Sequence, residues 1–179
     1  MSKLLVQGGL VVAAVLALGA GGFAQDRSGP SYAYGIRTGF GLDPDQFVIG
    51  AQAKFGRFGG IARVEPTFDV GFGDKMTTYL LNADLRLDIL PLPKSETVVY
   101  GGFGPTLAYF DFNGGGDFPD DSDTEIGLNL TTGVELPMGR SNSYNFEARF
   151  GIGDIPEFRL LLGVYFGGGG SRSDALDSE

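Results

Sequence analysis

The sequence predicts an all-β fold, an eight-stranded antiparallel up-and-down transmembrane β-barrel preceded by a cleavable signal peptide. Three observations predict it. Eight segments alternate apolar and polar residues with a period of two, which is the period of a β-strand. The segments are about ten residues long, the length that a tilted strand needs to cross a bilayer. Charged residues occupy the faces opposite to the apolar ones, which indicates that the apolar faces point outward into lipid.

The chain begins with the layout of a secretory signal. Lys3 precedes an apolar run over Leu10–Ala20, and small residues up to Ala24 lead into a polar stretch. The run is too short for a membrane-spanning helix, so we expect cleavage after Ala24. The predicted domains are a signal peptide (1–24), a barrel (25–166) and a flexible tail rich in Gly, Ser and acidic residues (167–179). The chain has no Cys, which excludes disulfides and lipid attachment at a cysteine.

The first four predicted strands cover 32–42, 46–55, 62–72 and 79–89. In each, aromatic and aliphatic residues take every second position, and polar, charged or small residues lie between them. The fourth is the most regular, because Asn and three charged residues alternate with apolar ones. The third contains Pro66, which has no backbone N–H and is typical of an edge or a bulge.

The last four predicted strands are less uniform. The fifth, Glu96–Tyr109, is ambiguous because its apolar residues blur the two faces, whereas 126–136 and 144–152 alternate clearly. The eighth, Phe158–Phe166, ends on an aromatic residue. The connection 111–124 is the longest, and with a periplasmic N-terminus it lies outside the cell, as the long loops of such barrels do.

Charged residues in these strands fall on the face opposite to the apolar one, so we expect them to line the barrel interior and to pair there. The positions are Arg37, Lys54, Arg63, Glu65, Asp69, Asp84, Arg86, Asp88, Glu125, Glu135, Glu147, Arg149 and Arg159. Acidic and basic residues nearly balance, and an eight-stranded barrel is narrow enough for its own side chains to fill it. This favours a plugged, salt-bridged interior over an open pore.

The predicted extracellular connections are strongly acidic, with Lys75 as their single basic residue. The acids are Asp43, Asp45, Asp74, Asp111, Asp117, Asp120, Asp121, Asp123, Asp154 and Glu157. Solvation and repulsion of other chains explain such a charge block. The alternative is a divalent-cation site at Asp117, Asp120, Asp121 and Asp123, which supply the carboxylate oxygens that Ca²⁺ accepts but lack the regular spacing of an EF-hand.

Several function classes are excluded or disfavoured by composition. The chain has no His and no Cys, which removes Ser-His-Asp and cysteine-based catalysis, so we expect no enzyme activity and no cofactor. The net charge of −9 and the absence of a basic patch argue against nucleic-acid binding.

The chain resembles the small eight-stranded outer-membrane barrel families, such as OmpX-like proteins and the OmpA transmembrane domain. The resemblance rests on the signal peptide, the eight alternating segments and Val164-Tyr165-Phe166 at the end of the last strand. In those families, a terminal strand ending in an aromatic residue is the signal that the barrel-assembly machinery reads. That implies an assembly signal at Phe158, Leu160, Leu162, Val164 and Phe166. The tail at 167–179 departs from the family pattern, in which the aromatic residue usually ends the chain.

We therefore expect a monomeric, non-enzymatic protein of the outer membrane of a Gram-negative-type bacterium, with a structural or surface-interaction role through acidic loops. The expected partners are outer-membrane lipid, the barrel-assembly machinery and, at the acidic loops, divalent cations. Two alternatives remain: a small channel or transporter for ions or apolar solutes, and a secreted, lipocalin-like barrel with a ligand inside. The second requires the apolar faces to point inward, and alternation alone does not distinguish the two orientations.

Overall fold

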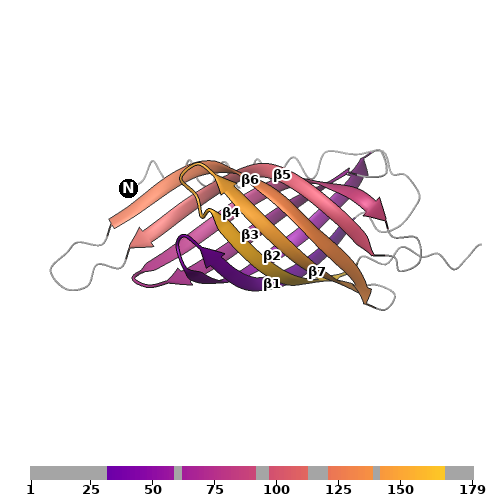
Figure 1. Cartoon of the computed structure of the whole chain (residues 1–179), viewed down its shortest axis with the longest axis horizontal. Coiled ribbons are helices and arrows are strands. Elements are labelled where there is room, and N and C mark those ends of the chain that lie inside the picture. Colours follow the sequence, from indigo (N-terminus) through magenta and orange to yellow (C-terminus); the bar gives the residue numbers. More distant parts are fainter. Residues whose placement is uncertain (1–31, 59–61, 92–96, 113–120, 139–141, 168–179) are drawn as a thin grey trace, which may run out of the picture.

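The structure is a computed structural model that describes residues 32–58, 62–91, 97–112, 121–138 and 142–167 (Figure 1). These residues form eight strands: β1 (Tyr32–Leu42), β2 (Gln46–Phe58), β3 (Ala62–Gly73), β4 (Met76–Pro91), β5 (Val98–Phe112), β6 (Asp121–Met138), β7 (Asn142–Ile152) and β8 (Phe158–Phe166). Each strand pairs antiparallel with the next, and β8 pairs with β1. The predicted closed up-and-down barrel is confirmed. Within the described ranges, no helix has the length and apolar character needed to cross a membrane.

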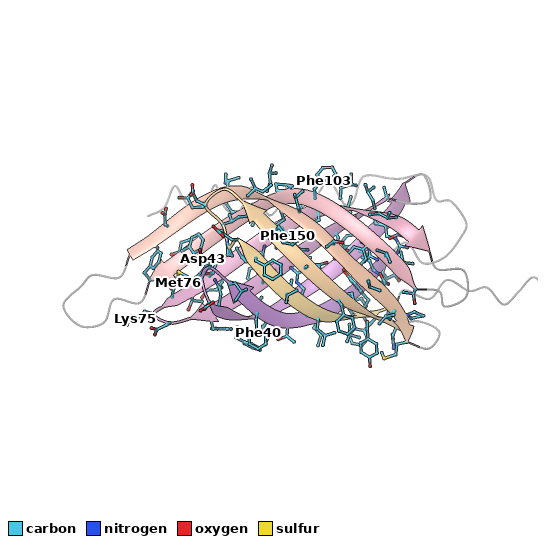
Figure 2. All side chains as sticks on the ribbon, in the orientation of Figure 1. Phe40, Asp43, Lys75, Met76, Phe103 and Phe150 are labelled. Atoms are coloured by element: carbon cyan, nitrogen blue, oxygen red, sulfur yellow. The ribbon has the colours of Figure 1, made fainter. Side chains whose placement is uncertain are left out.

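The two ends of the barrel differ. One end, here the terminal end, holds the first and last residues of the barrel, Tyr32 and Phe166. Phe166 pairs with Tyr34, two residues along β1 from Tyr32. The other end, here the acidic end, holds the β1–β2, β3–β4, β5–β6 and β7–β8 connections. Figure 2 shows Asp43 and Lys75 at this end. Residues 1–24, for which a signal peptide is predicted, and 168–179 of the predicted tail lie outside the described residues.

The longest hairpin is more regular than predicted. β5 runs to Phe112 and β6 begins at Asp121, so both ends of the predicted loop 111–124 are strand. The prediction of those boundaries was wrong because Asp, Ser, Thr and Glu occupy both faces of 121–125. Apolar alternation marks a strand only where one face meets lipid or a core, and it disappears where the strand rises into water.

The barrel wall has an apolar outside and a polar inside. Large apolar side chains such as Ile36, Phe40 and Leu160 are more than half exposed, whereas Asp69 and Arg159 are fully buried. Figure 2 shows Phe40, Phe103 and Phe150 on the outer surface of the wall. This orientation contradicts the lipocalin-like alternative, in which the apolar faces would line the interior.

Pro66 interrupts one ladder without ending the strand. The β2–β3 ladder skips from the pair Gln52–Thr67 to the pair Phe55–Val64, while Pro66 itself pairs with Ala83 on β4. Pro66 therefore does not mark an edge strand, because β3 has a neighbour on both sides, but the ladder beside it is interrupted, as a proline leads one to expect. The register of the β2–β3 ladder shifts between Phe55 and Phe58, away from the proline.

A small apolar core lies at the acidic end. Ile155, from the β7–β8 connection, is buried against Leu80 and Ala108. Backbone hydrogen bonds hold this connection in place: the Gly151 N–H donates to the Glu157 carbonyl, and the Glu157 N–H donates to the Asp43 carbonyl. The β7–β8 connection is thus tied to the β1–β2 turn across the closure of the barrel.

Candidate functional site: the charged interior

Twelve charged side chains meet inside the barrel, and each takes part in at least one ion pair. Six are basic (Arg37, Lys54, Arg63, Arg86, Arg149, Arg159) and six are acidic (Glu65, Asp69, Asp84, Asp88, Glu135, Glu147). All twelve belong to the thirteen interior positions predicted from the sequence. The charges of this set balance, which is the condition for ionised groups to persist away from water.

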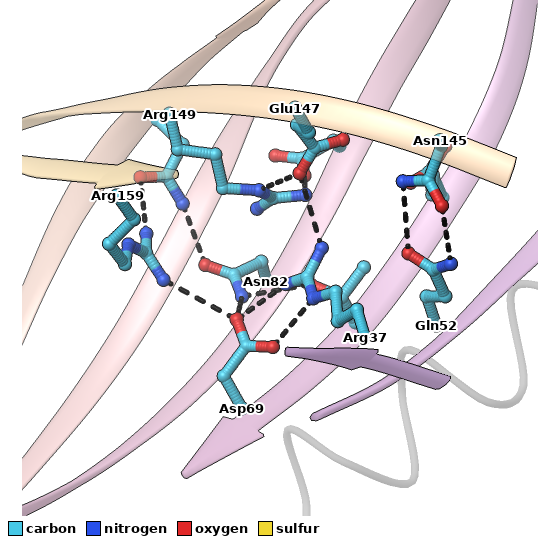
Figure 3. A network of polar contacts seen from close by, with 12 residues as sticks. Arg37, Gln52, Asp69, Asn82, Asn145, Glu147, Arg149 and Arg159 are labelled. Atoms are coloured by element: carbon cyan, nitrogen blue, oxygen red, sulfur yellow. Dashed lines mark hydrogen bonds and ion pairs between the residues drawn. The ribbon is translucent and has the colours of Figure 1, made fainter. Parts of the chain in front are cut away.

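The first cluster lies nearer the acidic end and centres on Asp69 of β3 (Figure 3). Arg37 of β1 donates hydrogen bonds to both carboxylate oxygens of Asp69, and its Nε lies 2.6 Å from Oδ1. Arg159 of β8 approaches the same carboxylate at 3.4 Å. Two arginines therefore share one acid, and the other Arg37 amino group, 3.3 Å from Glu147, links the cluster to β7.

Glu147 extends this cluster across the barrel. Its Oε1 lies 2.5 Å from the Nε of Arg149, its neighbour two residues along β7. Arg149 in turn reaches Asp84 on β4, with 2.6 Å between Nη2 and Oδ2. The first cluster thus joins five strands, and its three arginines balance its three acids.

Neutral polar side chains fill the space around the first cluster. The Asn82 amide donates to the Thr67 hydroxyl at 2.9 Å, and its carbonyl accepts from Thr106 at 2.8 Å and from Asn129 at 2.6 Å. Arg159 donates to the Asn129 carbonyl at 2.9 Å. These groups bring neutral side chains from facing strands into contact with one another and with Arg159.

The second cluster lies nearer the terminal end and centres on Arg86 of β4. Arg86 pairs with Glu135 of β6, with Glu65 at 3.4 Å and with Asp88 at 3.4 Å. Glu135 also binds the Lys54 ammonium at 2.7 Å. Arg63, the most exposed member, pairs with Asp88 at 3.1 Å. This cluster likewise contains three basic and three acidic side chains.

Two buried tyrosines contact the charged clusters, and Tyr100 connects one cluster to the other. The Tyr100 hydroxyl donates to Glu147 of the first cluster at 3.0 Å, and the guanidinium of Arg86 lies 3.6 Å from the centre of the Tyr100 ring. The Tyr165 hydroxyl donates to Glu65 at 2.6 Å, and the Lys54 ammonium lies 3.8 Å from its ring centre. Each tyrosine donates a hydrogen bond to an acid and has a cation over the face of its ring. Through Tyr100, which contacts both clusters, the network is continuous along the barrel.

The thirteenth predicted position, Glu125, lies apart from this network. It is half-exposed at the acidic end of β6, near the carboxylates of Asp123 and Asp154. Its place in the alternation is that of an interior residue, but β6 carries it past the last pairing with β7. The periodicity of a strand tells which face a residue occupies and not its height along the barrel.

The predicted loop cation site is described only in part. Asp117 and Asp120 lie outside the described residues, as does the side chain of Asp121, and Asp123 lies on β6. Among the side chains that the structure describes, no group of three or more acidic residues has the geometry to hold a metal ion.

Tyr100 is an interior residue that the sequence prediction missed. Val98, Val99 and Tyr100 are consecutive apolar residues, so the alternation there points to neither face. The signal that could have found it lies on the neighbouring strand, because Tyr100 faces Gly133 and the ring contacts the position where a Cβ would be. The pairing of a large buried ring with a glycine on the next strand cannot be seen in the residue pattern of one strand alone.

The outer face carries aromatic rings near both ends. Tyr79 packs beside Tyr109 with 6.0 Å between ring centres at the acidic end, and Tyr34 packs beside Phe166 at 6.1 Å at the terminal end. Aromatic girdles at these two levels are typical of barrels at the two membrane–water interfaces. The predicted assembly-signal residues lie in the same outer face of β8, where Leu160 and Leu162 are exposed.

Comparison with known proteins shows the fold. No family model matches the chain, and no curated protein matches its sequence. The N-terminal β-barrel domain of OprF from Pseudomonas aeruginosa is similar with a TM-score of 0.58 and 12% identity, over 77% of this chain and 98% of that domain. Neisserial surface protein A is similar with a TM-score of 0.59 and 18% identity, over 76% of this chain and 95% of that protein.

The attachment invasion locus protein Ail of Yersinia pestis is also similar, with a TM-score of 0.53 and 13% identity, over 79% of this chain and 99% of Ail. Identities this low carry a likeness of fold and nothing finer. The predicted resemblance is thereby confirmed at the level of architecture: the chain has the fold of the small eight-stranded outer-membrane β-barrels.

Proposed function

We propose that this chain is a non-enzymatic barrel of the outer membrane of a Gram-negative bacterium, and that it acts through its acidic end and not as a pore. The observation that carries the proposal is the inverted distribution of polarity. A wall that is apolar outside and ion-paired inside is stable in lipid, whereas in water it would expose a continuous apolar surface.

The outer face supports a lipid environment. Among the described side chains on the outer face of the strands, Asp111, at the acidic end, is the one that carries a charge. A lysine or arginine near the midplane of that face would cost about 2–4 kcal/mol. The chain thus keeps its charges where lipid does not reach them.

The interior supports a closed barrel. Ion-selective pores are lined by rings of one charge sign, but here each cluster is neutral and its members bind one another across the lumen. The rings of Tyr100 and Tyr165 and the apolar contact of Ile155 add to the filling. The channel alternative would require this network to open.

The acidic end faces the outside of the cell in this proposal. Among the described residues, the β1–β2, β3–β4 and β7–β8 connections at that end carry five acids and one base: Asp43, Asp45, Asp74, Asp154, Glu157 and Lys75. Barrels of this class place their longer loops outside and their termini in the periplasm. A structural role or the binding of a surface partner follows, with the acidic end as the contact region.

The test combines fractionation with conductance. The full-length chain is expressed in a Gram-negative host, the outer membrane is isolated, and unboiled and boiled samples are compared on a detergent gel. We expect recovery in that fraction with a mobility shift, and no conductance steps in planar bilayers, where an open porin in parallel is the control. Recovery as a soluble periplasmic protein refutes the membrane assignment, and regular conductance steps refute the closed interior.

A further inference from the structure

Among the residues that the structure describes, one edge of β6 has no neighbouring strand near the acidic end. β6 has 18 residues, and β5 pairs with it along its length, up to Phe112–Asp121. On the other side, the ladder with β7 begins only at Leu128–Ile152. Figure 1 shows β5 and β6 extending past β7 and β8 at this end. In the described part of the chain, the segment Asp123–Ile126, here called the β6 edge, therefore pairs with β5 alone.

The backbone of the β6 edge offers a donor that points away from β5. The Thr124 N–H donates to Oδ1 of Asp123 at 2.8 Å. On an antiparallel strand, successive N–H groups point to opposite sides, so an N–H bound to a side chain instead of the facing strand belongs to the open side. The Ile126 carbonyl points to the same side, because it lies near Gly153 of the β7–β8 connection. Such an edge is a template for another strand.

The charges around the β6 edge determine which strand could pair with it. Asp123 and Glu125 lie on the edge itself, and Asp154 adds a third negative charge that acts on Glu125. Like charges placed opposite each other destabilise a strand pair, so two copies of this edge repel. A segment with alternating Lys or Arg would instead face these acids with opposite charge.

We propose that the β6 edge binds an extended, basic segment of a partner protein by strand addition. A basic side chain of the partner pairs with the Asp123 carboxylate and draws it from the Thr124 N–H. That N–H then donates to a backbone carbonyl of the added strand. Ile126, which is 75% exposed, supplies an apolar neighbour for a side chain on the outer face. The inference rests on the proposed function, since it needs the acidic end to be accessible outside the cell.

The test uses the full-length mature barrel in detergent micelles and a fluorescent peptide of eight residues that alternates Lys with Thr and Val. A peptide of the same sequence with all backbone nitrogens methylated keeps the charge but cannot form a ladder. We expect the parent peptide to bind, and Thr124→Pro and Asp123→Asn each to weaken it by about tenfold, the effect of losing a hydrogen bond to a charged group or an ion pair at a strand edge. Of the backbone groups of the β6 edge, proline at 124 removes the outward N–H and keeps those that face β5.

The control is Asp45→Asn, which removes one exposed acid from the β1–β2 turn and should leave the affinity unchanged. The inference is overturned if the parent peptide does not bind, if the methylated peptide binds as well, or if Asp45→Asn weakens binding as much as Asp123→Asn. The mobility shift of unboiled samples shows that each variant is folded. A failure of the proposed function appears separately, as absence of the barrel from the outer membrane.

Discussion

Replacing Glu147 by Gln tests whether the interior network stabilises the barrel. Glu147 is buried and binds three groups: Arg37 at 3.3 Å, Arg149 at 2.5 Å and the Tyr100 hydroxyl at 3.0 Å. The glutamine keeps the size of the side chain but leaves the first cluster with one uncompensated positive charge. Removing one partner of a buried ion pair typically costs about 3–5 kcal/mol. We expect a loss of that size in the free energy of unfolding.

The assay is a urea titration of the barrel folded in phospholipid vesicles. The chain has no Trp, so the folded fraction is read from the mobility of unboiled samples. Asp45→Asn removes the same charge from an exposed turn and should change the free energy by less than about 0.5 kcal/mol. The double variant R37Q/E147Q restores neutrality and should lose less than the sum of the single variants. Equal stability of Glu147→Gln and Asp45→Asn would refute a stabilising network.

Three further predictions concern the ring bridge, the wall and assembly. Tyr100→Phe keeps the ring over Arg86 but loses the hydrogen bond to Glu147, so the free energy of unfolding should fall by about 1.5–3 kcal/mol in the same titration. An unchanged urea midpoint would show that this hydrogen bond does not stabilise the barrel. Gly104→Ala places a Cβ against the backbone of β4, 2.6 Å from the nearest Cα, and should abolish the mobility shift; a normally folded variant would contradict this close approach. Phe166→Ala should lower outer-membrane recovery more than Phe150→Ala, and equal recovery would argue against an assembly signal at the end of β8.

Much of the barrel wall could be predicted because each strand carries its own pattern. The limits of β1 and β8 agree with the sequence prediction, since both strands lie between lipid and a polar interior along their whole length. The ends of β5 and β6 could not be found in this way, because near Asp123 both faces of the strand meet water. Glu125 shows the same limit, for its face was predictable and its height above the network was not.

The sequence by itself determined which side chains share a face, because the period of a strand is a local property of the backbone. It did not determine which face points inward, since an alternating strand is equally regular in either orientation. In the closed barrel, the charged side chains are buried and the large apolar ones are exposed. Closure of β1 on β8 and the register of the ladders also decide which interior residues meet. They bring Arg37 to Glu147 across 110 positions of the chain and place Tyr100 between two clusters. Contacts across a lumen depend on how far along the barrel axis each residue of two distant strands lies. Only the tertiary structure contains that information.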